Sequence, residues 1–331
     1  MRQRALIAIA AAAALVVAVA LSLALGSRPI DLGTVWNALV DLDPEDPEQL
    51  IVRELRASRT LIGVLAGAAL GVAGALMQSL TRNPFADPGL LGINAGASLA
   101  VVIALTAGLG GGFAAQVPIA FVGAGIAAVV VYAIGARGAA AGAPVRLALA
   151  GVALTALITS VTYAVLLVDD ATLEQYRLWV AGSLTGRQSE DVTALVPIVL
   201  VAIAVALLAS RQLQAVALGE DAARALGIRI GGIRTLTIVI VTLLAASATA
   251  AAGPLVFVGL AVPHLARALV GASLPWLLIV SALGGAALVL VCDIVGRVIA
   301  PPSEIGVGIT TALIGGLIFA LMARRMKVVE L

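Results

Sequence analysis

Long apolar runs separated by short polar stretches make up most of the chain. A bilayer core about 30 Å thick needs roughly 20 helical residues for one crossing, and most of the runs have about that length. The pattern therefore predicts an all-α polytopic membrane protein with about ten transmembrane helices, organised as one domain over residues 1–331. The runs lie near residues 5–25, 60–80, 92–110, 115–136, 146–168, 192–210, 233–252, 254–270, 274–299 and 305–323.

The eighth run, residues 254–270, fits a full crossing least well. Gly253-Pro254 separates it from the seventh run, and it contains Pro263, His264 and Arg267. Because it is short, it predicts either a spanning helix or a half-helix that enters the bilayer and returns.

A polar break that contains proline separates the second run from the third. The Gly/Ala-rich second run reaches a cluster of Gln78, Arg82 and Asn83, and the apolar pattern resumes after residues 87–89, Asp-Pro-Gly. Hydrocarbon cannot satisfy the backbone groups of such a segment, so the break must face protein, an aqueous cavity or the membrane surface. This break is the candidate mouth of a transport pathway.

Composition and charge agree with a lipid surrounding and indicate an orientation. Hydrophobic residues make up 62% of the chain and charged residues 11%, against roughly 25% charged residues in an average soluble domain. With ten helices and an inner N-terminus, the inner segments hold 13 of the 20 basic residues, which predicts that both termini are cytoplasmic. The net charge of +2 is divided between the two faces and indicates no nucleic-acid partner. The 13 basic residues are Arg2, Arg4, Arg82, Arg137, Arg146, Arg211, Arg224, Arg229, Arg234, Arg267, Arg324, Arg325 and Lys327.

Two longer segments outside the apolar runs are predicted to face the exterior. Residues 26–59 contain the acidic stretch DLDPEDPE and are expected to form a solvated external loop. Residues 169–191 contain Tyr176 and Trp179, and we expect a short interfacial helix there with this aromatic pair at headgroup level.

An inner segment, residues 210–232, is too polar to span the membrane and carries the signals of a short cytoplasmic helix. Gly219 can start the helix, and Glu220 and Asp221 in its first turn suit the positive end of the helix dipole. Arg224 follows within reach of both acids. Gly227 is placed to end the helix in a left-handed conformation.

This short helix would present Ala222, Ala223 and Leu226 as a small apolar face. Such a face can fit into a groove on a partner protein. A helix lying on the membrane surface is the alternative, but it would have a larger apolar face and more basic residues. The sequence therefore favours a coupling loop that binds a partner.

The chain lacks the residues for nucleotide hydrolysis or for a His/Cys metal site. A phosphate-binding loop of the Walker type needs a lysine after its glycine-rich turn, and the only lysine is Lys327. His264 and Cys292 are the only imidazole and thiol, too few for such a metal site within one chain. We therefore expect no catalytic residue, no metal and no cofactor on this chain, with ATP and Mg²⁺ held by a partner.

Asp293 is the only acidic residue well inside a predicted span, and Arg297 follows one helical turn later. An intramembrane carboxylate can mark the proton relay of an ion-driven secondary carrier. An ion pair between Asp293 and Arg297 is the simpler interpretation. The carrier remains an alternative of a different functional class.

Several stretches together resemble the FecCD-type, or type II, ABC import permeases of the iron-siderophore, haem and vitamin B12 family. The resemblance runs in order from about residue 30 to residue 325, and permeases of the ferric-enterobactin type are the most similar members. The stretches are GALMQSLTRNPFADPGLLGINAGAS, RLALAGVAL, LWVAGSL, LGEDAARALGI, GPLVFVGLAVPHLAR and DIVGRVI.

The resemblance implies a type II importer permease in the bacterial cytoplasmic membrane that carries a ferric siderophore. It implies a dimer with a second permease chain, either a copy or a paralogue, two cytoplasmic ATPase subunits and an external substrate-binding protein. Haem or cobalamin are the alternative cargoes.

The resemblance also assigns three groups of site residues. It makes the helix around Glu220 to Gly227 the ATPase-coupling element and places a cytoplasmic gate at Asn83, Pro84 and Phe85. The aromatic Phe85 stands where the family usually has leucine. It implies that Arg56, Arg59 and Arg297 are outward-facing arginines that receive carboxylates of the binding protein.

Overall fold

The computed structural model describes residues 1–26, 29–109, 112–135, 143–185, 193–218, 220–300 and 303–325. Every predicted apolar run contains a helix, which confirms the all-α fold. The helices are α1 (Arg2–Ala24), α2 (Leu32–Val40), α3 (Pro47–Leu50), α4 (Ala57–Thr81), α5 (Ile93–Thr106), α6 (Phe113–Gly135), α7 (Ala143–Leu166), α8 (Asp170–Val180), α10 (Leu195–Leu218), α11 (Glu220–Ala225), α12 (Ile230–Ala252), α13 (Val258–Val270), α14 (Leu274–Ile299) and α15 (Val307–Arg325), with a π-helical turn at Ile51–Arg56 and a 3-10 turn at Pro88–Leu91.

Not all of the ten runs form full-length spans. Among the described residues, seven helices are long and apolar enough to cross a membrane, and α5, α13 and residues 307–321 of α15 are shorter apolar helices. At 1.5 Å per residue, the 14 residues of α5 cover about 21 Å, less than the bilayer core of about 30 Å. For the eighth run, α13 has 13 residues, which supports the half-helix alternative.

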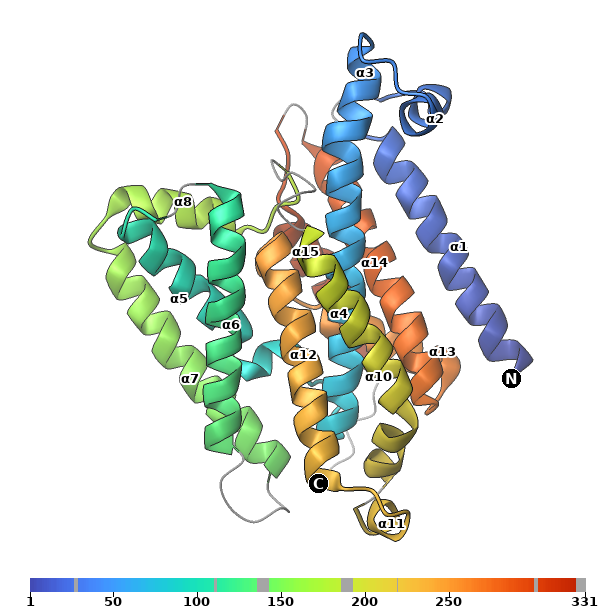
Figure 1. Ribbon diagram of the computed structural model, residues 1–331, viewed down its shortest axis with the longest axis vertical. Helices are drawn as coiled ribbons and strands as arrows, with labels where there is room; N and C mark the ends of the chain where they lie inside the picture. Colours follow the sequence, from blue (N-terminus) through green and yellow to red (C-terminus); the bar gives the residue numbers. More distant parts are fainter. Residues whose placement is uncertain are drawn as a thin grey trace.

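Helix α4 runs through the centre of the bundle and contacts α10, α12, α13 and α14 (Figure 1). Gly63, Gly67, Gly71 and Gly74 follow one side of α4. A side chain at Gly67 or Gly71 would overlap the backbone of α14, and one at Gly74 would overlap the backbone of α13. Without a hydrophobic force between helices in lipid, small residues of this kind allow the close backbone contact that holds helices together.

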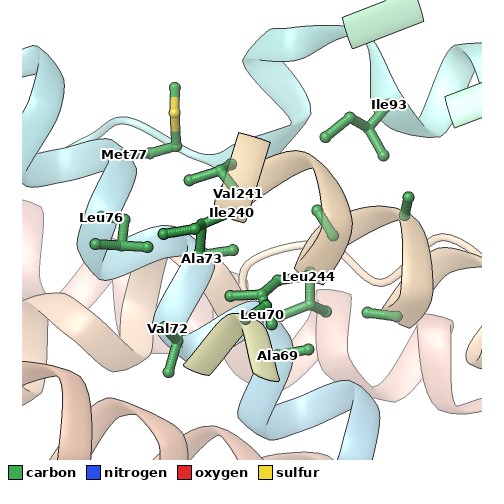
Figure 2. Packing of buried hydrophobic residues seen from close by; sticks show 14 of the residues in the cluster. Ala69, Leu70, Val72, Ala73, Leu76, Met77, Ile93, Ile240, Val241 and Leu244 are labelled. Carbon is green, nitrogen blue, oxygen red and sulfur yellow. The ribbon is translucent and has the colours of Figure 1, made fainter. Parts of the chain in front are cut away.

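The core around α4 is closed by larger apolar side chains (Figure 2). Leu76 and Met77 of α4 are fully buried, as are Val241 and Leu244 of α12 and Ile93 of α5. Close packing on both sides makes α4 the element through which the other helices are positioned.

The N-terminal external segment, predicted as a solvated loop over residues 26–59, is largely helical instead. Asp46 caps α3 through the amide of Glu48, and α3 continues through the π-helical turn into α4. Pro47–Thr81 is thereby one apolar helix of 35 residues. The prediction failed because a cap followed by proline at the first helical position starts a helix even in an acidic stretch.

The polar break after α4 folds back into the bundle. Arg82 ends α4 in a left-handed conformation with φ of 52°, and residues 83–92 then lead to the start of α5. A methyl group at Gly259 of α13 would lie 2.8 Å from Pro88 Cδ and 3.1 Å from Asp87 Oδ2. The break therefore packs against protein, one of the three surroundings expected for it.

The predicted short helix in residues 169–191 is α8, and its N-terminus is capped by Asp169. Its aromatic pair is stacked, with the ring centroids of Tyr176 and Trp179 6.4 Å apart. Trp179 is only 6% exposed, and that the pair lies at headgroup level stays a prediction. Tertiary packing buries the indole inside the protein.

Candidate functional site

The two ends of the bundle carry different candidate sites. Helices α2, α3 and α8 lie toward one end, called here the α8 end, and α11 lies at the other, called the α11 end (Figure 1). The C-terminus of α4 belongs to the α11 end, because Arg82 Nη2 donates to the carbonyl oxygen of Val216 near the end of α10, at 2.9 Å.

Arg56, Arg59 and Arg297 meet at the other end of α4, where the end of α1 packs against α4 and α14. Arg56 lies in the π-helical turn, Arg59 in the first turn of α4 and Arg297 near the end of α14. Their exposed fractions are 7%, 9% and 2%. The structure thus brings together three residues that only resemblance had grouped, but it buries them where the resemblance implied outward-facing side chains.

Two of these arginines cap the C-terminus of α1. The last carbonyl groups of a helix have no partner within it and carry the negative end of the helix dipole. Guanidinium groups supply both the donors and the opposite charge. The acceptors are the carbonyl oxygens of Ser22 and Leu25 for Arg297 Nη1, at 3.0 and 2.9 Å, and those of Leu23 and Ala24 for Arg56 Nη1, at 2.8 and 2.7 Å.

Asp293 lies between the guanidinium groups of Arg59 and Arg297. Arg59 donates from Nη2 to Asp293 Oδ1 at 2.7 Å and from Nε to Oδ2 at 3.0 Å. Arg297 Nη2 lies 3.0 Å from Asp293 Oδ2, so the ion pair expected between Asp293 and Arg297 is present. The sequence had given no sign that Arg59 shares the same carboxylate, because the two residues are 234 positions apart.

Glu304 completes this outer arginine cluster, which consists of Arg56, Arg59, Arg297, Asp293 and Glu304. Arg59 Nη1 donates to Glu304 Oε2 at 2.7 Å, and the Glu304 side chain is 30% exposed. Partial burial raises the pKa of the Glu304 carboxyl, but the hydrogen bond and charge of Arg59 lower it by more, so this pKa lies below its usual value. Three cations and two anions make up the cluster, the charge of Glu48 also acts on Arg56, and Glu304 is the most accessible member.

The candidate gate, Asn83, Pro84 and Phe85, forms a tight turn directly after α4. Asn83 Oδ1 accepts a hydrogen bond from the backbone N–H of Phe85 at 2.9 Å, and the Asn83 carbonyl oxygen accepts one from the N–H of Ala86 at 3.1 Å. These bonds fix the direction in which the Phe85 side chain leaves the turn.

Phe85 is 41% exposed and meets two aromatic side chains from distant parts of the chain. Its ring packs edge-on against Phe319 of α15, with centroids 5.7 Å apart. Phe319 in turn lies 6.2 Å from Phe257, the residue before α13. Sequence reasoning singled out neither Phe257 nor Phe319, since nothing local relates them to the gate.

The candidate coupling segment, predicted as a loop over residues 210–232, is shorter than predicted. Residues 210–218 belong to α10 and residues 230–232 to α12. The short helix is α11, and Gly227 ends it with φ of 74°. The predicted contact between Arg224 and Asp221 is present at 3.2 Å. Gly219 lies outside the described residues.

The predicted apolar face of α11 is divided by the structure. Leu226 is 71% exposed, whereas Ala223 is fully buried against the rest of the protein. The prediction that Ala223 belongs to the docking face is therefore wrong, because Ala223 packs α11 onto its own bundle. The side chains of Glu220 and Ala222 lie outside the described residues.

In the described part of the chain, no three His, Cys, Asp or Glu side chains are grouped closely enough to hold a metal ion.

Comparison with known proteins gives consistent similarities. Residues 14–325 match the FecCD transport family. The chain is 44% identical over 277 residues to the ferric enterobactin transport system permease protein FepD of Escherichia coli, covering 83% of this chain and 82% of that protein. It is 39% identical over 291 residues to the Fe(3+)-citrate import system permease protein YfmD of Bacillus subtilis, covering 84% and 82%.

A third relative and one solved structure extend the comparison. The hemin transport system permease protein HmuU of Yersinia pestis is 35% identical over 318 residues, covering 92% of this chain and 90% of that protein. A structure described as an inward-facing conformation of a metal-chelate type ABC transporter superposes with a TM-score of 0.85 at 26% identity, covering 97% of this chain and 99% of that one.

Proposed function

The chain belongs to the FecCD transport family, and from this premise we propose that it is the permease subunit of an ATP-driven importer for a ferric siderophore. The observation that carries the proposal is the similarity to the ferric enterobactin permease over most of both chains. The bundle of membrane-length helices around a broken, inward-folded segment supports a transport role.

The proposed complex contains partners that supply what this chain lacks. Two ATPase subunits bind ATP and Mg²⁺ and hydrolyse the nucleotide, since Lys327 is the only lysine of this chain. A second permease chain, a copy or a paralogue, completes the pathway. An external substrate-binding protein delivers the cargo. The complex resides in the bacterial cytoplasmic membrane with the α11 end in the cytoplasm, as the distribution of basic residues indicates.

Helix α11 is proposed to couple the permease to an ATPase subunit through Leu226. A large apolar side chain that is 71% exposed beside the buried Ala223 gives the short helix one anchor for a groove on a partner. The ion pair of Asp221 with Arg224 and the left-handed Gly227 hold the turn that presents Leu226.

The gate is proposed to close by aromatic packing. Phe85 is anchored by the turn at Asn83 and leans on Phe319 of α15. Withdrawal of Phe85 from Phe319 would open the cytoplasmic end of the pathway. Two aromatic rings in edge-on contact contribute about 0.5–1.5 kcal/mol beyond the area that they bury, which is small enough to be overcome in each transport cycle.

Docking of the binding protein is proposed at the outer arginine cluster, with Arg59 as the residue that a carboxylate reaches. Glu304 occupies one side of the Arg59 guanidinium and is itself partly exposed. An incoming carboxylate can replace Glu304 there while Asp293 keeps the other side. Guanidinium suits this exchange because its planar fork binds two carboxylates on different edges.

The test is reconstitution of the permease with its ATPase and binding protein in proteoliposomes, with a panel of ferric catecholates, ferric hydroxamates, haem and cobalamin. We expect uptake of a ferric siderophore that requires ATP and the binding protein. Haem uptake alone would favour the alternative cargo, for which the similarity to the hemin permease is the supporting observation. Uptake without any ATPase that collapses with the ion gradient would replace the proposal with a secondary carrier.

A further inference from the structure

A pocket of about 390 Å³ lies at the α11 end of the bundle, between the ends of α4, α10 and α13 and the start of α14. Its polar lining is formed by Gln78, Ser79, Arg82, Gln214 and Arg267. Pro84 of the gate turn also lines it, but neither Phe85 nor any described side chain of α15 does, so the pocket lies beside the contact of Phe85 with Phe319. Its size is in the range of pockets that hold small molecules.

Among the residues that the structure describes, the pocket lining has two arginines and no carboxylate. Arg82 uses Nη2 for the carbonyl oxygen of Val216 at 2.9 Å, and Arg267 Nη2 lies 3.4 Å from Ser79 Oγ. Neither arginine has an ion-pair partner within the described residues. Each guanidinium has five N–H donors, so most of their donors remain available to a ligand.

The neighbouring polar groups add donors and a buried acceptor. Gln214 Oε1 accepts from the backbone N–H of Leu274 at 3.3 Å, which leaves the Gln214 amide group as a further donor. Gln78 is 2% exposed and donates to the carbonyl oxygen of Leu260 at 3.1 Å, while its own Oε1 has no partner among the described residues. A buried acceptor without a described partner, next to two arginines without a described ion-pair partner, points to a ligand that has both anionic oxygens and a hydrogen-bond donor.

A third cation approaches the same corner. A methyl group at Gly271, in the turn between α13 and α14, would lie 3.8 Å from Arg4 Nη2 of α1. The next residue of this turn, Ala272, lines the pocket. Arg4 therefore adds a third positive charge at the turn that borders the pocket.

These features match a phosphate group better than a carboxylate. Two guanidinium groups and the Gln214 amide can each donate to a different phosphate oxygen, and arginine recognises phosphate through two parallel hydrogen bonds. Basic pockets between transmembrane helices on the cytoplasmic side are known to take acidic lipid headgroups. The flanking helices also carry exposed leucines, Leu208 of α10 at 84% and Leu269 of α13 at 59%, against which acyl chains can lie.

We propose that this pocket binds the phosphate of an anionic phospholipid from the leaflet at the α11 end. Arg82 and Arg267 are the side chains that bind the phosphate oxygens. The choice of the inner leaflet rests on the orientation given under the proposed function. A phospholipid such as phosphatidylglycerol would also supply glycerol hydroxyl donors for Gln78 Oε1. Bound there, the lipid would tie α4, α10 and α13 together directly behind the gate turn.

The experiment is native mass spectrometry of the full-length chain in detergent, titrated with dioctanoyl phosphatidylglycerol or dioctanoyl phosphatidylcholine. It needs neither ATP nor cargo, so its outcome is independent of the transport proposal. We expect tighter binding of phosphatidylglycerol, and about tenfold weaker binding in Arg267→Gln, since a hydrogen bond to a charged group contributes about that factor. Arg211→Gln, which removes an exposed arginine of α10, should bind as the unchanged chain does.

Size-exclusion chromatography shows whether Arg267→Gln folds. If it does not, the lipid affinity of Arg82→Gln is measured in its place. Equal affinity for the two lipids, or unchanged binding in both folded pocket variants, would overturn the proposal. Displacement of the lipid by inorganic phosphate at the same concentration would assign the pocket to free phosphate. Loss of ATPase binding in Arg267→Gln with unchanged lipid binding would assign it to an acidic partner residue. Either result would also overturn the lipid proposal.

Discussion

Arg59 and Asp293, 234 residues apart in the chain, are joined in a buried position by a hydrogen bond of 2.7 Å from Arg59 Nη2 and by two of 3.0 Å from Arg59 Nε. The pair ties the start of α4 to α14 beyond the glycine stripe along which these helices touch. Because burial removes water from both groups, the pair stabilises the contact only while both charges are present. The relationship has measurable consequences for stability and for docking.

Asp293→Asn should destabilise the chain by about 3–5 kcal/mol, the usual cost of removing one partner from a buried ion pair. Two guanidinium groups, of Arg59 and Arg297, would lose their shared carboxylate. Thermal unfolding in detergent measures the effect. Glu174→Gln is the control, since the ion pair of Glu174 with Arg177 is exposed and its loss should leave the unfolding temperature unchanged. Equal unfolding temperatures for both variants would contradict the prediction.

The docking proposal predicts opposite effects of two substitutions in the outer arginine cluster. Arg59→Glu should slow association of the binding protein, and Glu304→Gln should speed it a few-fold, because the Glu304 carboxylate is ionised at neutral pH and competes for Arg59. Both effects should be largest at low salt, since salt screens charges over about 10 Å at 0.1 M.

Glu45→Gln is the matched control for docking, because it removes the same charge from an exposed position before α3. Association rates from surface plasmon resonance at several salt concentrations test the prediction. A compensating Glu→Arg change on the binding protein should restore the rate with Arg59→Glu. If Glu45→Gln and Glu304→Gln act equally, only the overall charge of this end matters and Arg59 is not the docking residue.

The orientation predicts that a cysteine at Glu45 is labelled by an impermeant maleimide from outside the cell. A cysteine at Arg224 should be labelled only after permeabilisation. The native Cys292 is fully buried, so it should contribute little background. Labelling of both positions from the same side would refute the arrangement of the helices between them.

Leu226→Asp should weaken ATPase binding by tenfold or more, about 1.4 kcal/mol, because a charge on the docking face must lose its water of hydration. The variant should fold normally, since Leu226 is exposed. Ala223→Asp should instead lower the unfolding temperature, because Ala223 is buried. An ATPase pull-down and cargo-stimulated hydrolysis measure the loss of coupling, and thermal unfolding measures the loss of stability. Normal cargo-stimulated hydrolysis with Leu226→Asp would rule out coupling through α11.

Phe85→Ala should raise basal leak or futile ATP turnover, and Phe319→Ala should do the same, because the two rings pack against each other. The double variant should leak no more than the stronger single variant, since residues in contact are not additive. Tyr163→Ala on the exposed side of α7 is the control. Flux into proteoliposomes at matched protein amounts gives the result, and strictly additive leaks would mean that the two rings do not form one gate.

The helices of the ten apolar runs, the polar break and α11 were predictable from the sequence, whereas α2 and α3 were not. Helix length and the signals at helix ends, such as a following glycine and acids in the first turn, depend on residues close together in the chain. The excess of arginines in the inner segments is a simple count along the sequence. The single lysine, single histidine and single cysteine likewise argue from composition alone against a nucleotide loop of the Walker type and against a His/Cys metal site within this chain.

Only the tertiary structure decided which distant residues meet. Arg59 finds Asp293 and Glu304, Phe85 finds Phe319, and Ala223 turns inward while Leu226 stays exposed. Each outcome depends on the register and crossing angle of helices that are far apart in the chain. Register and crossing angle depend in turn on how closely the helix backbones approach at glycines such as Gly67 and Gly71. Periodicity determines which face of a helix is apolar, but a partner from another helix is chosen only when the packed bundle brings their side chains within bonding distance.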